Sequence, residues 1–491
     1  MLFLRVFRSL PTLTCLALAG CGSSSSSTPG PGGATASGGQ GAAGGSANAS
    51  GGAPASGGAT TGGKAATTGG AVETGGAAPA GSSSGGAPSN GGAPANGGAP
   101  ASGGSGVAGG GSGGAAPADA SAELYDEENL PRFDLELSEA SMAALDAEPE
   151  VYVEGALSYD GETVSRIGVR IKGEGSRRTL EQKAAFKLKF DEFVDRQAFR
   201  GLRRMTLNNM VEDPSFMAER LAYRVFREAG LPAPRCNNAL LYVNGEYWGV
   251  YANVEAEDKT FLRRWFSDDG GNLYEEGQTD FVPGAEAKFD LETNETTNDR
   301  TDLAGLITAF QGAERDTFLE DLGAALDTER FLRFTAAELL VNQWDMYAYT
   351  MFYPNNFRLY SDPTSGRFVF LPWGMDMSMK PFRDSRRKHL RPFEVARQGD
   401  RMTTAISAGL IFQRCLESEA CKARYAEAVA ELVEVYEKAE LEARAARHYE
   451  QIREHVESDP RSEYAPEEFE TGYASLLSTI RERAAAVRAE L

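Results

Sequence analysis

The stretch Val341–Met379, VNQWDMYAYTMFYPNNFRLYSDPTSGRFVFLPWGMDMSM, carries three oxygen-bearing side chains around a predicted β-hairpin. The runs FRLY and RFVFLPW have strand character, and SDPTSG between them is a turn sequence. A hairpin brings the residues before its first strand close to those after its second. Asp345, Asn356 and Asp376 are therefore expected to share one cleft. Such oxygen donors suit a hard cation, for example Mg²⁺ carrying phosphates.

The first 21 residues, MLFLRVFRSLPTLTCLALAGC, combine two arginines with a short apolar run and small residues before Cys21. This pattern predicts a secretory signal that is too short to span a membrane stably. The ending LAGC resembles a bacterial lipobox, so Cys21 is expected to carry a lipid. An ordinary signal peptide cut near Ala19 is the alternative. We expect an extracytoplasmic protein, anchored to a bacterial membrane at the cell envelope or surface.

Residues 22–120 consist mainly of Gly, Ala, Ser, Thr and Pro and contain no aromatic residue. A segment of this composition cannot form a core, so it is expected to be a disordered tether. The formal net charge of −21 therefore lies almost wholly on residues 121–491. Such acidity argues against a nucleic-acid partner and for solubility.

Cys415 and Cys421 are close enough in RCLESEACKAR to bridge a short turn between helices. Export makes a disulfide between them plausible. Cys236 is then a lone, buried thiol. With three histidines in the whole chain, a His-rich metal site or a Ser–His triad is not expected.

Two neighbouring predicted strands, in ETVSRIGVRIKG and KAAFKLKF, alternate apolar and basic residues. Lys172 ends the first strand, and Lys187 and Lys189 share one face of the second. The glycine-rich, basic segment GEGSRR joins them. This cluster in an acidic domain favours an anion site, because glycine loops with nearby cations commonly meet phosphates. A solvated outer face is the alternative.

Two helices are predicted after these strands. One follows Ser215 as N-cap, carries Glu219 and ends at Gly230. Another, over residues 328–343, delivers Asp345. The order predicts an α+β fold of two lobes with a cleft between them. We expect the domain to cover residues 121–425, with residues 426–491 as a helical extension packed on it.

Several stretches resemble the CotH kinase family, the spore coat protein H-like atypical protein kinases. They are VRIKGEGSRR, KAAFKLKF, MTLNNMVEDPSFMAERLAYRVFREAGLPAPR, VNGEYWGVY and NQWD…NNFRLY…GRFVFLPWGMD, in this order, over roughly residues 125–400. The resemblance implies a two-lobed kinase-like fold with a β-rich N-lobe and a mainly helical C-lobe. It also implies ATP and Mg²⁺ or Mn²⁺ bound between the lobes.

The same resemblance implies residue roles. Asp345 is similar to the catalytic aspartate that orients or deprotonates the acceptor hydroxyl. Asn356 resembles a metal-holding asparagine, and Asp376 is the second aspartate of a P-W-D-x-D motif. The phosphate-binding lysine corresponds to Lys187, with Lys172 and Lys189 as alternatives, and Glu219 to its helical partner. The first aspartate of that motif is replaced here by Gly374, which has no side chain to hold a metal.

Together with the N-terminal signal pattern, the resemblance predicts an exported, lipid-anchored kinase that transfers the ATP γ-phosphate to Ser or Thr of surface or secreted proteins. The departure at Gly374 supports an alternative, a catalytically impaired pseudokinase that serves as a surface binding or structural module. A hydrolase that uses Asp345 and Asp376 as a carboxylate pair in a sugar cleft is a third reading.

Overall fold

The computed structural model describes residues 119–350, 353–381, 389–394 and 408–491. The expected signal segment, Cys21 and all but the last residues of the expected tether lie outside the described residues. Within the described part of the chain, no helix is both long and apolar enough to cross a membrane.

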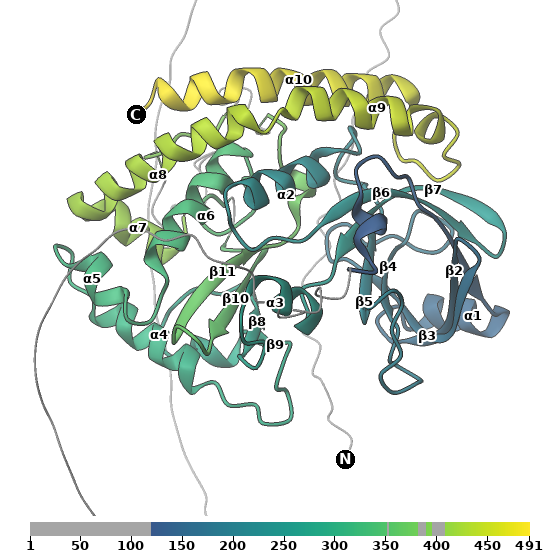
Figure 1. Cartoon of the computed structure of the whole chain (residues 1–491), viewed down its shortest axis with the longest axis horizontal. Helices are drawn as coiled ribbons and strands as arrows, with labels where there is room; N and C mark the ends of the chain where they lie inside the picture. The colour runs from purple at the N-terminus through teal and green to yellow at the C-terminus, as the bar shows by residue number, and fades with distance from the viewer. Residues whose placement is uncertain (1–118, 351–352, 382–388, 395–407) are drawn as a thin grey trace, which may run out of the picture. The chain divides into compact units, whose positions relative to one another are not determined.

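Seven strands of the first half form a closed barrel in the order β1-β2-β3-β4-β5-β7-β6 (Figure 1). Neighbouring strands are antiparallel, except that β1 pairs with β6 in parallel and closes the barrel. Individual strands were predicted from the sequence, but this closure was not. The strands are β1 Arg132–Leu137, β2 Val153–Tyr159, β3 Glu162–Lys172, β4 Ala185–Lys189, β5 Arg204–Asn208, β6 Cys236–Val243 and β7 Glu246–Glu255.

Alternation along β3 and β4 decides which side chains fill the barrel. Ile171 and Phe186 face each other in the β3–β4 register and belong to its apolar core, at 2% and 0% exposure. Because successive side chains point to opposite faces, the interleaved Lys172 and Lys187 lie on the other face and are only half-buried. The strand period thus turns the basic side chains outward from the barrel core.

The β6–β7 hairpin turns at Asn244 and Gly245, as its sequence predicts. Both residues have positive φ, 51° and 81°, which a two-residue hairpin turn of this kind requires. The Asn244 side chain also accepts a hydrogen bond from the N–H of Leu137 and donates one to its carbonyl. The turn therefore ties the end of β1 to the hairpin.

Two helices flank the barrel strands, and one begins later than predicted. Ser138 caps α1 (Glu139–Ala147) and accepts the N–H of Ser141. The prediction that Ser215 caps the next helix is wrong, because α2 spans Ala218–Glu228. The carboxylate of Asp213 instead accepts hydrogen bonds from Ser215 and from the N–H of Ala218. This carboxylate organises the turn and delays the helix.

The second half contains a four-stranded antiparallel sheet, ordered β11-β10-β8-β9, among helices. Strands dominate up to Glu255 and helices after it, so the predicted α+β order is confirmed. The sheet strands are β8 Leu273–Glu275, β9 Asp290–Leu291, β10 Phe357–Asp362 and β11 Arg367–Pro372. The helices are α3 Lys259–Trp265, α4 Thr301–Gly312, α5 Phe318–Leu322, α6 Thr328–Leu340, α7 Leu410–Glu417, α8 Glu419–Lys438, α9 Leu441–Glu457 and α10 Pro466–Arg488.

The last three helices pack on earlier elements (Figure 1). Helix α8 contacts α6, α9 contacts α2 and β7, and α10 contacts α6, α8 and α9. The buried guanidinium of Arg483 donates to the carbonyls of Leu339 and Leu390, which ties α10 to the end of α6. A disulfide between Cys415 and Cys421, with a Cα–Cα distance of 5.1 Å, links α7 to α8. Cys236 is a free, buried thiol.

Candidate functional site

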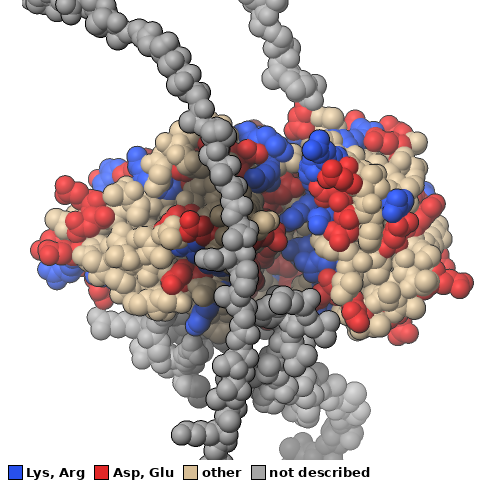
Figure 2. Space-filling model, turned by 90° about the horizontal axis from the view of Figure 1, so that it is seen from below, with Lys and Arg blue, Asp and Glu red and all other residues tan. Residues whose placement is uncertain are grey.

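A cleft of about 680 Å³ is lined by residues of the barrel and by residues around the β10–β11 hairpin. Five of the side chains singled out in the sequence line it: Lys172, Lys187, Asp345, Asn356 and Asp376. Segment 173–177, from the glycine-rich loop between β3 and β4, lines it as well. Figure 2 shows Lys and Arg side chains gathered towards the middle of one face, with Asp and Glu side chains near them.

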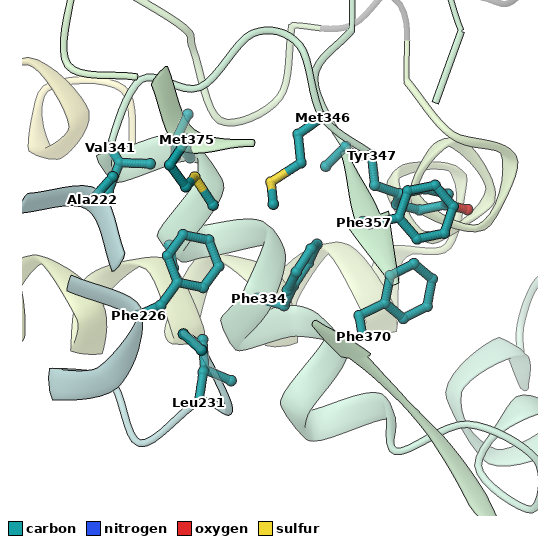
Figure 3. Close-up of a cluster of buried hydrophobic side chains, with 14 of the residues drawn as sticks. Ala222, Phe226, Leu231, Phe334, Val341, Met346, Tyr347, Phe357, Phe370 and Met375 are labelled. Atoms are coloured by element: carbon teal, nitrogen blue, oxygen red, sulfur yellow. The ribbon is translucent and has the colours of Figure 1, made fainter. Parts of the chain in front are cut away.

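The hairpin side of the cleft comprises the β10–β11 hairpin and the segments just before and after it. Each of its polar residues has a buried apolar residue next to it in the sequence, which acts as an anchor. Met346 follows Asp345, Phe357 follows Asn356, and Met375 lies between Gly374 and Asp376. These three anchors are fully buried. They belong to one apolar cluster, in which they lie near Phe334 and Phe370 (Figure 3). Burial of the anchors therefore fixes the backbone from which the polar groups project.

A buried carboxylate holds the segment after Asp345. The Glu338 side chain, on α6, accepts the N–H groups of Ala348 and Tyr349 at 2.9 and 2.7 Å. Burial raises the pKa of Glu338 well above its usual value, although these two hydrogen bonds oppose the shift. Gln343 adds a second tie, since its side chain accepts the N–H of Asp345 and donates to the carbonyl of Gly374.

Asp345 and Asn356 form the central pair of the hairpin side. The Asn356 amide donates to the Asp345 carboxylate at 2.9 Å and to the Asp345 carbonyl at 2.7 Å. The Asn355 amide reaches the same carboxylate oxygen at 3.4 Å. Burial raises the pKa of Asp345 to about 6, and the nearby Asp376 adds to that shift. Asp345 is thus oriented by amides and has a pKa suited to accepting a proton near neutral pH.

The space beside Gly374 that a side chain would fill is taken by the side chain of Asn356. The φ and ψ of Gly374 are both 59°, in the left-handed region. A Cβ at this position would overlap Oδ1 of Asn356. The Asn356 amide nitrogen is committed to Asp345, and among the described residues nothing donates to its Oδ1. This oxygen is the atom that Asn356 can offer to a cation.

The available donors for a hard cation are therefore Asp345, Asp376 and the Asn356 Oδ1. Two carboxylates and an amide oxygen are the types that Mg²⁺ or Mn²⁺ accepts. Across the described ranges, no group of three or more His, Cys, Asp or Glu side chains is arranged to hold a metal. The donor set fits a cation that retains several waters or phosphate oxygens, and it fits a closed all-protein metal cage poorly.

On the barrel side, Asn208 connects a lysine to a buried glutamate. The Lys172 ammonium donates to Oδ1 of Asn208, and the Asn208 amide donates to both oxygens of Glu219 at 2.9 and 2.8 Å. Burial, reinforced by Asp376, raises the pKa of Glu219 to about 8. Burial also lowers the pKa of Lys172, although Glu219 opposes that shift. Glu219 itself lies behind the cleft, fully buried.

Lys187 makes no ion pair or hydrogen bond with another side chain of the described residues, although it lies in the field of Glu275. Burial lowers the pKa of Lys187 to about 8, and Glu275 opposes the shift. The Glu275 carboxylate is held by Arg358 at 3.0 Å. Although burial opposes it, the field of Arg358 and Lys187 lowers the pKa of Glu275 to about 2. Lys187 is the lysine of this cleft whose charge is left for a ligand.

Two adjacent carboxylates at the end of β8, Glu275 and Glu276, were missed in the sequence. Glu276 accepts the N–H of Asn356 at 3.0 Å, and burial, followed by the charge of Glu275, raises its pKa to about 8. The adjacent carboxylates in LYEE, at the end of this short strand, were a usable signal. Arg358 was another, since it stands alone among apolar residues in FRLY. Asn208 gave no such signal, because its partners come from other segments.

A smaller pocket of about 240 Å³ adjoins the cleft and shares Arg170, Lys187 and Trp373 with it. Lys189 lines this pocket, not the cleft, and pairs with Glu192 at 2.6 Å. Glu257 also lines it. It is 1% exposed and pairs with Arg358 at 3.4 Å, and no described residue donates a hydrogen bond to either of its carboxylate oxygens. Burial raises the pKa of Glu257 to about 8.

Trp373 connects the two sides of the cleft. The Lys172 ammonium lies 5.6 Å and the Arg358 guanidinium 4.6 Å from the centre of its ring. Cations at these distances from an indole face are attracted to it. Lysines from the barrel, a fixed Asp–Asn pair and a glycine-rich loop thus share one cleft, an arrangement suited to a phosphate-bearing ligand.

A family described as CotH kinase protein matches residues 169–487. This span is more than half of the 491-residue chain, so the chain belongs to this family, as its sequence predicts. The limits differ from the prediction, which ended the specific part near residue 400. The match extends through α8, α9 and α10, so these helices belong to the family's domain.

Two curated relatives come from Bacillus subtilis (strain 168). Inner spore coat protein H is 24% identical over 221 residues, which cover 43% of this chain and 59% of that protein. Inner spore coat protein H-like protein is 32% identical over 80 residues, covering 16% of this chain and 24% of that protein. The chain thus spans less than two thirds of either relative.

Solved structures overlap this chain weakly. The Helicobacter pylori proinflammatory kinase CtkA gives a TM-score of 0.27 at 10% identity, covering 68% of this chain and 88% of that chain. A chain of the Shewanella oneidensis MR-1 toxin–antitoxin complex of HipA, HipB and operator DNA gives 0.23 at 11% identity, with coverages of 72% and 81%. Neither score defines a shared fold.

Proposed function

We propose that this chain is a protein kinase that binds ATP with Mg²⁺ or Mn²⁺ between a β-rich N-lobe and a mainly helical C-lobe. It transfers the γ-phosphate to Ser or Thr of a protein acceptor. One observation carries the proposal: Asp345, oriented by Asn356, lines the same cleft as Lys172 and Lys187. Phosphoryl transfer mostly needs positioning and neutralisation of charge, and these groups supply both.

Each group has a role in this proposal. The smaller pocket beside Glu257 takes the base, and Lys187 with the glycine-rich loop meets the phosphates. Asn356 and Asp376 would hold the cation, which would neutralise charge on the phosphates. The acceptor oxygen bonds to the γ-phosphorus while the bond to the β–γ bridging oxygen breaks and ADP leaves. Asp345 accepts the hydroxyl proton.

Two measurements test this function. A thermal-shift series should show stabilisation by ATP with Mg²⁺ or Mn²⁺ but not by either alone, because binding to the folded state raises its stability. Labelled ATP should then transfer phosphate to the chain itself or to a Ser/Thr-containing protein. If no nucleotide–metal pair stabilised the chain, the proposal would lose its basis.

A second candidate function rests on Gly374. A pseudokinase would bind nucleotide but transfer no phosphate, because a metal-holding carboxylate is absent at this position. Stabilisation by nucleotide without transfer to any of a panel of surface proteins would favour this candidate. The same domain would then serve as a binding or structural module.

Export and lipid anchoring at Cys21 are part of the proposal and are supported by the lipobox-like LAGC. They place the acceptor among surface or secreted proteins of the cell envelope. Metabolic labelling with a radioactive fatty acid should mark the chain, and Cys21→Ser should abolish the label. Equal labelling of the variant would contradict the anchor.

A further inference from the structure

The connection between α9 and α10, residues 458–465, contacts the segment that follows the glycine-rich loop. Arg178 forms a bidentate ion pair with Glu463. Arg461 donates to three successive carbonyl groups that lie about 280 residues earlier in the sequence. These are the carbonyls of Leu180, Glu181 and Gln182, at 2.7, 3.0 and 2.8 Å. One guanidinium thus binds carbonyls that no strand or helix satisfies.

A buried ion pair reinforces this contact. The side chains of Lys183 and Asp459 are 1% and 0% exposed and pair directly. Asp459 also accepts the N–H of Val250 at 3.1 Å and that of Arg461 at 2.9 Å. Burial lowers the pKa of Lys183, and Asp459 opposes the shift. Since an unpaired buried charge is costly, the two segments are held together as a unit.

The motif VNGEYWGVY, which runs from the end of β6 through the hairpin turn into β7, packs against this turn. Gly249 has a φ of 113°, and a Cβ there would overlap the Asp459 carboxylate. The neighbouring Trp248 takes the Arg461 guanidinium 3.9 Å from the centre of its ring. Gly249 therefore leaves room for Asp459, and Trp248 binds Arg461 of the same turn.

The loop held in this way lines the cleft. Gly173, Gly175, Ser176 and Arg177 are among the lining residues. The Asn209 amide donates to the carbonyls of Ser176 and Lys183, at 3.0 and 2.8 Å. Movement of residues 178–183 would consequently be transmitted to the part of the loop that meets a ligand.

We infer that residues 459–463 act as a brace that orders the glycine-rich loop and thereby sets the affinity of the cleft for a nucleotide. Arg461 and Glu463 are positioning residues that act through the loop without touching the ligand. The inference rests on the proposed function, because it concerns nucleotide affinity. A loop that is ordered beforehand loses less conformational entropy on binding, so affinity rises without any new contact.

The test compares two brace variants of the full chain, Arg461→Gln and Glu463→Ala, with two matched controls. Arg481→Gln and Glu442→Ala break an exposed ion pair between the same two helices, away from the loop. Hydrogen exchange of residues 173–183 is measured without ligand. The dissociation constant and KM for ATP with Mg²⁺, and kcat, are measured in parallel.

Arg461→Gln should accelerate exchange in residues 173–183 and raise the dissociation constant and KM by about tenfold, with a much smaller change in kcat. Glu463→Ala removes only the partly exposed ion pair with Arg178 and should change the same quantities less. The controls should match the unaltered chain. A merely structural role would lower stability without this split between KM and kcat.

Unchanged exchange in both brace variants would overturn the inference. Faster exchange with unchanged nucleotide affinity would overturn it as well, because the loop would then be held without consequence for binding. If the unaltered chain binds no nucleotide, the proposed function fails, and the claim on affinity fails with it. The exchange measurement would still decide whether the turn orders the loop.

Discussion

On the barrel side of the cleft the buried carboxylate of Glu219 is linked through Asn208 to a cation, Lys172. On the hairpin side the buried carboxylate of Glu338 meets, among the described residues, only the N–H groups of Ala348 and Tyr349. The first arrangement balances charge inside a network. The second uses a carboxyl group to set the shape of a loop. Changes on the barrel side are therefore expected to alter ligand affinity or the stability of this network, and changes on the hairpin side to alter catalysis and stability.

The largest effect is expected at Asp345. Asp345→Asn keeps the size of the side chain but removes the group that accepts the proton. Phosphate transfer should fall by about 10²–10⁴-fold, the usual contribution of a general base, while nucleotide binding is largely retained. Labelled-ATP transfer and thermal shift measure the two quantities. Asp316→Asn, at an exposed carboxylate, is the control, and transfer that survives in Asp345→Asn would refute the assignment.

Gly374→Asp tests whether the missing carboxylate can be restored. The new Cβ would overlap Oδ1 of Asn356, so we expect the Asn356–Asp345 hydrogen bonds to be disturbed and metal affinity not to rise. Gly366→Asp is a matched control, since Gly366 also has a positive φ but has open space around it. Gly374→Asp should lower the free energy of unfolding by about 1–3 kcal/mol more than the control does. A large gain in transfer would instead identify the natural chain as a disabled kinase.

The two lysines should separate affinity from stability. Lys187→Met removes a cation that has no ion-pair partner among the described residues, so nucleotide affinity should fall by about tenfold, or ~1.4 kcal/mol, with little loss of stability. Lys172→Met leaves Glu219 with Asn208 alone and should lower the melting temperature. Because the pKa of Lys187 is about 8, binding to the unaltered chain should weaken as pH rises through 8. Calorimetric titration between pH 7 and 9 checks this, and equal effects of both variants on affinity would contradict the distinction.

The last effect is expected at Glu338 and appears as a pH dependence of stability. Its pKa is raised in the folded chain, so the folded state retains a proton that the unfolded state loses. Stability should therefore fall as pH rises above the unfolded value of about 4.3, by up to ~1.4 kcal/mol per pH unit. Glu338→Gln should remove this slope, which denaturant unfolding at pH 5, 6 and 7 measures. Glu329→Gln, at an exposed carboxylate of the same helix, should leave the slope intact.

Local patterns were enough to predict much of this site. The alternation in β3 and β4 identified Lys172 and Lys187, and the hairpin signal correctly predicted that Asp345, Asn356 and Asp376 lie near one another. Both patterns depend on neighbours within a few residues. Asn208 was missed, since its role arises only where β5 lies beside both Lys172 and α2. The start of α2 was misplaced because the Asp213 carboxylate, not Ser215, organises the turn before it.

By itself the sequence determined the family, the α+β order and the chemical types in the cleft, because each follows from residue identity and short-range periodicity. Tertiary structure alone decided that β1 and β6 close the barrel, that Asn356 fills the space beside Gly374, and that Asp459 packs against Gly249. These features join residues that are distant along the chain. Whether a glycine leaves room for a partner, and which partner fills it, depends on packing between segments, which no local pattern encodes.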